Sequence, residues 1–342
     1  MPRHLRYSPQ TIPIAFVHSM LHGARAIGKP VEVFLADANI GVDLLAQANS
    51  RITATQYVAL FKSLVERLDD DLLGLQSRPL RRGSFALIAR SAIGAPTLDV
   101  AIRRIARTYR LLQDDVLMEL RQEGALVGFS FRFVEKPQSW PIFLHELLLR
   151  VFWRLLAWLI GGKLQVDHFD FAYSRPPYAE SYCRVFPAAV AFDCAHSAFW
   201  FDAACLQYRI RQDERPLFQF LANAQANIIA PQRNAHSLSV RVRNHLQQTP
   251  PQLWPDLVTT ADAMHMSSST LQRHLATEGS SYQALKDGLR RDLAIVRLST
   301  STIPLAALAD ELGFADSATF HRAFKGWTGS PPGAYRRNEE SR

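Results

Sequence analysis

The strongest constraint on the fold of this 342-residue chain lies near its C-terminus, where one local pattern occurs twice. Residues 258–275 and 305–324 each combine a short apolar helix, a tight break and a second helix with a polar face rich in hydrogen-bonding side chains. This pattern is typical of a helix-turn-helix, whose second helix enters the major groove of DNA. We therefore expect two helix-turn-helix units in tandem.

Residues that start and stop helices flank both second helices. Side-chain oxygens in Ser267–Ser269 can cap the first recognition helix, and Asp316 can cap the second. Gly279 and Gly329 follow the helix ends, where a left-handed residue often closes the last turn. Pro304 stands where the first helix of the second unit would begin.

The apolar residues of the two recognition helices predict which faces are buried. Leu271 and Leu275, and likewise Phe320 and Phe324, recur four residues apart and can face a core. This spacing leaves polar side chains on the outward faces, namely Ser269, Gln272, Arg273, Ser317, Thr319, His321 and Arg322.

The chemistry of these outward side chains suits DNA. Arg273 and Arg322 can bind a guanine edge in bidentate fashion or clamp phosphates, and Gln272 can read adenine. Ser269 and Thr319 suit contacts with bases or phosphates. In contrast, Ser317 and His321 are better placed to position the second helix against the DNA backbone. The alternative is that both faces are ordinary solvated surfaces.

A predicted helix over residues 281–298 joins the two units. Leu285, Leu289, Leu293 and Val296 form its apolar stripe. A helix of ~18 residues is ~27 Å long. With the bulk of each unit added, the two recognition helices could reach successive major grooves, ~34 Å apart.

The stretch from Leu312 to Arg336 resembles the signature of the AraC/XylS family of transcriptional regulators. It contains a Leu-Gly-Phe turn at 312, a Phe-x-Arg-x-Phe-Lys helix, Gly-x-x-Pro and Tyr-Arg. The resemblance implies binding to double-stranded promoter DNA, with RNA polymerase as a candidate partner. It places Ser269, Gln272, Arg273, Thr319, His321 and Arg322 at positions that the family uses on DNA. The chain departs from some relatives at Ser269, where they carry a bulkier residue.

Length predicts two domains, at residues 1–230 and 231–342, joined near a linker at 230–234. The net charge of +8 fits a polyanionic partner. However, residues 236–342 hold 12 Lys and Arg against 10 Asp and Glu, whereas residues 1–235 hold 27 against 21. The motif, and not the charge, therefore identifies the DNA-binding part.

Cysteine usage and the N-terminus bear on the compartment. Cys183, Cys194 and Cys205 have no close pair, which indicates a reducing cytosol, and they are candidate redox-sensing or buried structural thiols. The N-terminus lacks the pattern of a signal peptide. We expect a cytoplasmic, nucleoid-associated protein.

Residues 1–230 predict an α+β domain, with helices and a small antiparallel or mixed sheet, ahead of an all-α DNA-binding domain. Helical spacing occurs over 12–27, 41–47, 55–68, 84–93, 97–112, 178–185 and part of 212–233. Alternating or β-rich segments occur over 115–121, 125–134, 164–173, 190–192 and 199–201. Thr97 can cap the helix that follows it.

Residues 140–162 are the most apolar stretch of the chain. Glu146, Arg150 and Arg154 lie four apart on one helix face, which favours a soluble amphipathic helix with a buried opposite face over a membrane span. His145 and Glu146 begin a zincin-like pattern, but Leu149 replaces its second histidine. We expect no metal site, no cofactor and no catalytic residues.

Residues 85–216 resemble the arabinose-binding-type effector domain found in one branch of the same family. Gly83-Ser84, Ala95-Pro96-Thr97-Leu98 and Arg175-Pro176-Pro177 carry part of this resemblance. It implies a small-molecule effector without implying arabinose. The aromatic-rich stretch 140–201 could line its pocket or simply form core, and the sequence identifies no effector-binding residue.

Three functions fit the sequence. The first is a transcriptional regulator that responds to a small molecule and forms a homodimer. The second is a DNA-binding regulator without a ligand, controlled by a protein partner or by abundance. The third is an enzyme with a DNA-targeting tail that works through a cysteine. We expect the first.

Overall fold

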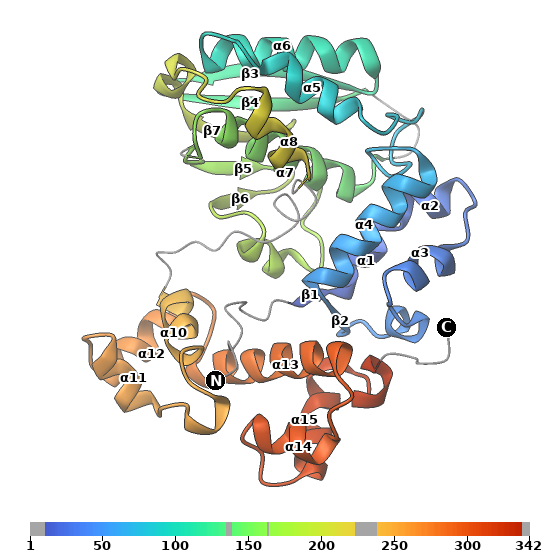
Figure 1. The fold of residues 1–342 in the computed structure, drawn as a ribbon. Helices are drawn as coiled ribbons and strands as arrows, with labels where there is room; N and C mark the ends of the chain where they lie inside the picture. The colour runs from blue at the N-terminus through green and yellow to red at the C-terminus, as the bar shows by residue number, and fades with distance from the viewer. Residues whose placement is uncertain (1–10, 135–138, 163, 223–237, 337–342) are drawn as a thin grey trace. The chain divides into compact units, whose positions relative to one another are not determined.

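The computed structural model describes residues 11–134, 139–162, 164–222 and 238–336. These residues form two compact units (Figure 1). Of the described residues, those within 15–38 and 57–222 belong to the larger unit, and those within 11–14, 39–56 and 238–336 belong to the smaller unit. The domain boundary expected at 230/231 lies outside the described residues and stays a prediction. The grouping of two N-terminal segments with the C-terminal helices was not anticipated by any sequence pattern.

Most helices of the larger unit follow the sequence predictions. They are α1 (Ile14–Met20), α2 (His22–Ala26), α3 (Val31–Asp37), α4 (Ala54–Leu68), α5 (Ser84–Ala92), α6 (Leu98–Leu112), α7 (Ile142–Leu159) and α8 (Glu214–Ala222), with 3-10 turns at Ala179–Arg184 and Ala203–Gln207. The single helix expected over 12–27 is wrong, because its first residues form a strand and the rest divides at Leu21. Thr97 occupies the N-cap position of α6, but its side chain makes no capping hydrogen bond.

A five-stranded mixed sheet forms one layer of the larger unit. Its strands are β3 (Val116–Glu123), β4 (Leu126–Phe133), β5 (His168–Asp170), β6 (Ala189–Ala191) and β7 (Ser197–Asp202), in the order β3-β4-β7-β5-β6. The predicted hairpin is confirmed, with Glu123 paired to Leu126 and Gly124 at φ +58° in the turn. The strand expected over 164–173 is shorter, covering His168–Asp170 only. β5 and β6 run parallel, and the other neighbouring strands run antiparallel.

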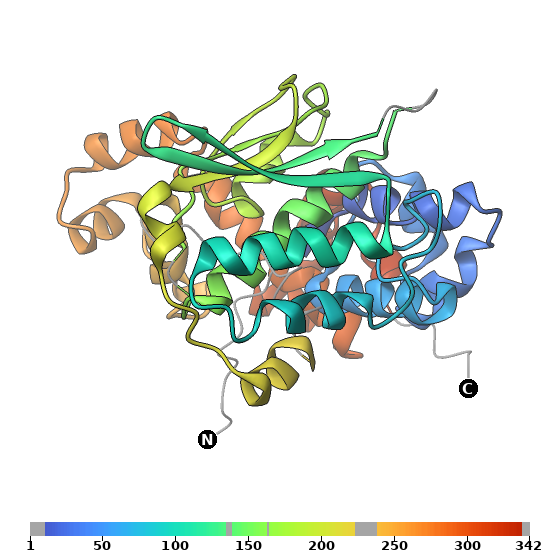
Figure 2. The ribbon, with the colours of Figure 1, turned by 90° about the horizontal axis from the view of Figure 1, so that it is seen from above.

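Helices pack on this sheet in two successive layers. α6 runs alongside the β3–β4 hairpin, and α5 packs on α6 (Figure 2). α7 contacts β7 and α6. Large aromatic side chains such as Phe129, Phe152 and Phe199 are fully buried and meet edge to face at the centre of this core.

The charged face expected on α7 is not a solvent face. Glu146 and Arg150 are buried, at 0% and 3% exposure. The Glu146 carboxylate accepts hydrogen bonds from the Tyr182 and Tyr178 hydroxyls, and Arg150 Nε donates to the Glu146 backbone carbonyl at 3.3 Å. Burial raises the pKa of Glu146 to about 7, against the opposing effects of Tyr182 and Arg150. Among the described helices, none is long and apolar enough to span a membrane.

The smaller unit contains the C-terminal helices and a two-stranded sheet. Its helices are α10 (Leu238–Leu246), α11 (Leu257–Ala263), α12 (Ser268–Thr277), α13 (Tyr282–Thr300), α14 (Leu305–Glu311) and α15 (Ser317–Thr328), with 3-10 turns at Val42–Ala46, Pro251–Leu253 and Pro332–Tyr335. Antiparallel strands β1 (Thr11–Pro13) and β2 (Arg51–Thr53) contact α13. In Figure 1, α13 runs between α10–α12 on one side and α14–α15 on the other.

Candidate nucleic-acid interface

The first helix-turn-helix is formed by α11 and α12. His265, at φ +60°, lies in the turn between them. Ser267 is the N-cap of α12, and its hydroxyl accepts from the Thr270 backbone N–H at 3.2 Å. Leu271 and Leu275 are fully buried, as predicted, in a core shared with α10 and α13.

The second helix-turn-helix is formed by α14 and α15. Gly313, at φ +75°, lies in the turn between them. Asp316 caps α15 by accepting from the Thr319 backbone N–H at 2.7 Å, and Gly329 ends the helix at φ +73°. The backbone hydrogen bonds at its N-cap lower the pKa of Asp316, so the carboxylate is charged at neutral pH. Phe320 and Phe324 are fully buried, and Pro304 occupies the N-cap position of α14.

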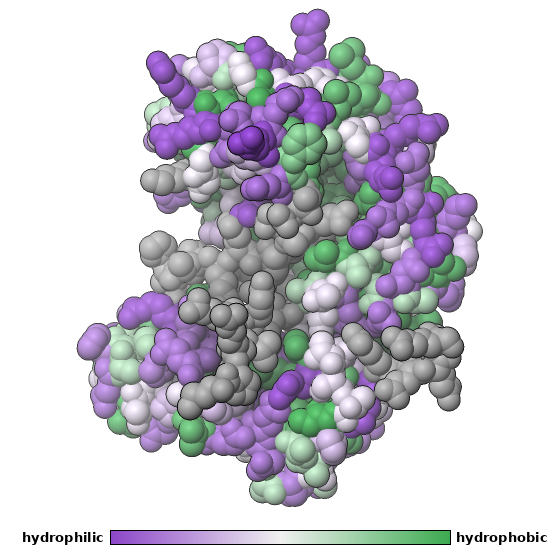
Figure 3. Space-filling view, in the orientation of Figure 1, coloured by the Kyte–Doolittle hydropathy of each residue, from purple (hydrophilic) through white to green (hydrophobic). Residues whose placement is uncertain are grey.

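The structure places the predicted DNA-contacting side chains on the outward faces of α12 and α15. Of these residues, only Thr319 is half-buried, and the exposed ones are Ser269, Gln272, Arg273, Ser317, His321 and Arg322. Arg322 donates to the Thr319 hydroxyl at 3.2 Å, and that hydroxyl donates to Asp316 at 3.0 Å. Around the first helix-turn-helix, at the lower left of Figure 3, the visible surface mixes hydrophilic and hydrophobic residues. Val258 of α11 is one exposed apolar residue of this helix-turn-helix.

α13 connects the two helix-turn-helix units through side chains that reach both. At 19 residues, it is ~28 Å long. Arg290 lies 5.5 Å from the ring centroids of both Trp254 and Phe314, and its Nε donates to the Leu312 carbonyl at 3.0 Å. A guanidinium between two rings contributes ~0.5–2 kcal/mol per contact. Arg290 therefore connects the first helix-turn-helix to the second.

The buried face of α13 differs from the predicted stripe in its second half. Leu285 and Leu289 are buried as expected, but Leu293 and Val296 are half-buried. Asp292 is buried instead, at 3% exposure, where it meets three arginines and Thr11. Sequence reasoning missed this residue. An aspartate one helical turn beyond Leu289, on the buried face, was the available signal.

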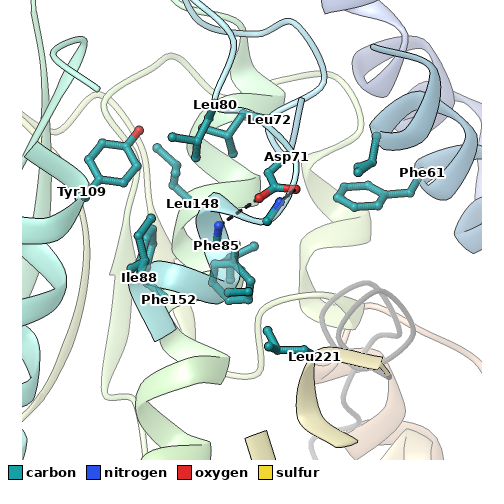
Figure 4. A pocket seen from close by; sticks show the side chains of 14 residues that line it. Phe61, Asp71, Leu72, Leu80, Phe85, Ile88, Tyr109, Leu148, Phe152 and Leu221 are labelled. Atoms are coloured by element: carbon teal, nitrogen blue, oxygen red, sulfur yellow. Dashed lines mark hydrogen bonds between the residues drawn. The ribbon is translucent and has the colours of Figure 1, made fainter. Parts of the chain in front are cut away.

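A cavity of about 200 Å³ lies within the larger unit (Figure 4). Its lining is mainly apolar and comes from α4 to α8, including Phe61, Leu72, Leu80, Phe85, Ile88, Leu148, Phe152 and Leu221. Asp71 is an acidic residue of the lining. Its carboxylate is already hydrogen-bonded, because it accepts from the backbone N–H groups of Phe85 at 2.9 Å and Gly83 at 3.4 Å. Burial raises the pKa of Asp71. The Tyr109 hydroxyl accepts from Gln76 at 2.7 Å.

The aromatic-rich stretch 140–201 contributes little to this cavity. Phe152 is its one aromatic residue in the lining, and most of the others are core residues. A second cavity, of about 550 Å³, is lined in part by Trp140, His145 and Tyr173 of that stretch. His145 stacks on Phe133 and contacts the Ser197 hydroxyl at 2.8 Å. Its burial lowers the pKa of His145 to about 3, so the ring is neutral.

Comparisons with known proteins identify two domains in the chain. Residues 28–210 match the family model described as the arabinose-binding domain of AraC transcription regulator, and residues 260–338 match a helix-turn-helix domain. The ornithine utilization regulator of Pseudomonas aeruginosa is 26% identical over 339 residues, covering 98% of this chain and 99% of that protein. The regulator VqsM of the same organism is 38% identical over 99 residues, covering 29% of this chain and 30% of that protein.

A solved structure, the transcriptional regulator CdpR of Pseudomonas aeruginosa, aligns over 98% of this chain and 99% of its own at 19% identity, with a TM-score of 0.33. The first family model is described by its occurrence in AraC transcription regulators, and the two relatives named above are both called regulators. The chain belongs to the AraC-type transcriptional regulators, with an N-terminal arabinose-binding-type domain followed by a helix-turn-helix domain.

Proposed function

We propose that one chain binds promoter DNA through both recognition helices, with α12 and α15 in successive major grooves. The observation that carries this proposal is the outward exposure of Gln272, Arg273 and Arg322 on two capped helices held by one spacer. Arginine pairs with guanine edges, and glutamine pairs with adenine. Ser269 and Thr319 would contact bases or phosphates, whereas Ser317 and His321 would position α15 on the DNA backbone.

Arginine truncation tests these assignments. Arg273→Ala and Arg322→Ala should each weaken specific binding by ~1–3 kcal/mol and relax the preference at one base position. Binding would be measured by fluorescence anisotropy on DNA selected from a random library, at fixed salt because phosphate contacts make affinity salt-dependent. Arg209→Ala, in the larger unit, is a matched control and should bind like the wild type. Uniform weakening across all sequences would assign the two arginines to phosphates instead.

We propose further that a small apolar effector binds in the 200 Å³ cavity. Drug-sized ligand pockets are ~300–1,000 Å³, whereas an apolar cavity of ~150 Å³ holds benzene. The cavity therefore fits one ring or a short hydrocarbon chain. The polar atoms of Asp71 and Tyr109 are occupied by protein partners, so the lining suits a zwitterion such as ornithine poorly.

A pair of matched variants tests the location of the effector. A specific ligand stabilises the folded state, so single-ring and short-chain compounds should raise the melting temperature of the wild type. Ala86→Phe would fill the first cavity and abolish this shift, whereas Ala172→Phe would fill the second cavity and keep it. The reverse pattern would move the effector to the second cavity. The absence of any shift across a metabolite panel would favour a regulator controlled by a protein partner or by abundance.

We propose that the protein acts as a homodimeric regulator in the cytoplasm, associated with the nucleoid and acting on RNA polymerase, without catalysis of its own. Support comes from the family, since both domain matches are of the regulatory class.

Cys194 is half-buried and Cys205 is buried, and burial raises the pKa of both thiols, which disfavours the reactive thiolate. The side chain of Cys183 lies outside the described structure. Alkylated DNA should therefore leave the mass of the protein unchanged.

A further inference from the structure

Asp292, in the middle of α13, is bound by residues that lie about 240–280 positions earlier in the chain. The Thr11 hydroxyl donates to Asp292 Oδ1 at 2.5 Å. Arg51 Nε donates to the Thr11 hydroxyl at 2.7 Å, and its Nη2 donates to the Thr11 carbonyl at 2.7 Å. Arg51 Nε also lies 3.8 Å from Asp292 Oδ1, and both side chains are less than a tenth exposed.

Two further arginines complete the surroundings of this carboxylate. Arg291 Nη2 lies 3.2 Å from Oδ1, and Arg243 Nη1 of α10 lies 3.8 Å from Oδ2. A buried charge is tolerated only when it is paired and hydrogen-bonded, and removal of one partner is more costly than for an exposed pair. Asp292 therefore joins α10, α13 and the β1–β2 pair at one point.

The same N-terminal segment also contacts the end of the second helix-turn-helix. The Arg51 backbone N–H donates to the Tyr335 hydroxyl at 3.2 Å. The Ser50 hydroxyl lies 3.5 Å from both the Thr328 carbonyl and the Ser330 hydroxyl, and all three residues are buried. These contacts fix the segment to the residues at and just beyond the C-terminal end of α15.

We infer that β1, β2 and residues 39–50 form a brace that is part of the DNA-binding machinery, with Arg51 as a positioning residue. The brace holds the second helix-turn-helix at a fixed place on α13. This inference rests on the proposed binding of DNA by both recognition helices. Two linked helix-turn-helix units bind more tightly than one only when their geometry allows both to contact the DNA at the same time. A flexible connection between them therefore lowers the overall affinity.

The brace is also continuous with the proposed effector-binding region along the chain. β2 ends at Thr53 and α4 begins at Ala54, with no residue between them. Further along α4, Phe61 and Val65 line the cavity. Residues 39–53 moreover fall inside the segment that matches the arabinose-binding family model. Part of the segment that matches the arabinose-binding family model thus belongs to the smaller unit, which holds both recognition helices.

The test compares two DNA fragments with full-length protein. One carries the sequence selected by the wild type from a random library, and the other has the segment read by α15 scrambled. Arg51→Met should reduce the affinity ratio between the two fragments by ~10-fold or more, while affinity for the scrambled fragment stays within ~2-fold of wild type. Arg51→Lys keeps the charge and should restore part of the ratio. Arg103→Met removes the exposed pair with Asp99 at 3.0 Å and should change neither affinity.

The outcomes separate the brace from the proposed function. An Arg51→Met protein with the wild-type ratio, or with equal losses on both fragments, overturns the positioning role. A wild-type protein that binds both fragments equally contradicts the proposed two-helix binding itself. If Arg51→Met does not fold, Tyr335→Phe removes only the hydroxyl that accepts from the Arg51 backbone. A smaller drop in the ratio supports the brace, and an unchanged ratio overturns it.

Discussion

Glu146 has an environment that its sequence pattern did not predict. Its spacing from Arg150 and Arg154 is that of an exposed ion-pair face, yet its carboxylate is fully buried beside Tyr178 and Tyr182. The residues that cover this face come from segments distant in the chain, such as Tyr57 of α4. Helical periodicity alone cannot report which neighbours will pack there.

The raised pKa of Glu146 predicts a dependence of stability on pH. Because the folded pKa of about 7 exceeds the ordinary value of 4.5, folding favours the protonated acid. This contribution is present below pH 4.5 and is lost as the pH rises to about 7, which amounts to about 3 kcal/mol. Glu146→Gln removes the ionisation. Its free energy of unfolding relative to wild type should therefore rise between pH 5 and pH 8.

Urea unfolding of both proteins at the two pH values measures this change. The comparison cancels the titration of His145, whose lowered pKa works in the opposite direction below pH 6.5 in both proteins. Glu66→Gln, at an exposed pair with Lys62, is the matched control and should show no such trend. Parallel stability curves for Glu146→Gln and wild type would mean that the buried carboxyl ionises at its ordinary pKa.

At the scale of elements, the sequence predicted the second recognition helix nearly completely. Asp316, Gly329 and the Phe320/Phe324 pair behave as their residue types dictate, because caps and amphipathic spacing are local properties. Three adjacent serines at the start of α12 left the first N-cap undefined, and the structure assigns it to Ser267. By contrast, the strands β1 and β2 are three residues each and pair only with one another, so no local pattern marked them.

The assignment of this cap leads to a direct comparison within the serine run. Ser267→Ala should lower the stability of the first helix-turn-helix by about 1 kcal/mol, because the Thr270 N–H loses its acceptor. Ser268→Ala, inside the helix, is the control and should have a smaller effect or a slight gain, since alanine favours helix. Hydrogen exchange of the α12 amides would measure both. Equal protection in the two variants would contradict the assignment of the cap.

At the scale of the whole molecule, family and domain order were readable from sequence, whereas the composition of the units was not. Helix-turn-helix signals and the Leu-Gly-Phe turn are contiguous in the chain. The strand order β3-β4-β7-β5-β6 and the contact between Thr11 and Asp292 depend on pairings between distant segments. Such pairings follow from the packing of the complete fold, and no local pattern in this sequence indicates them.

In the proposed function, one chain reads two successive major grooves through α12 and α15. The most direct test of this binding mode is the affinity of the full-length protein for its selected DNA after insertion of half a helical turn, about five base pairs, between the two contacted segments. With a fixed spacer helix, the second segment turns to the opposite side of the duplex. We predict that affinity falls to the level of DNA in which that segment is scrambled. Unchanged affinity after the insertion would contradict simultaneous binding by the two helices.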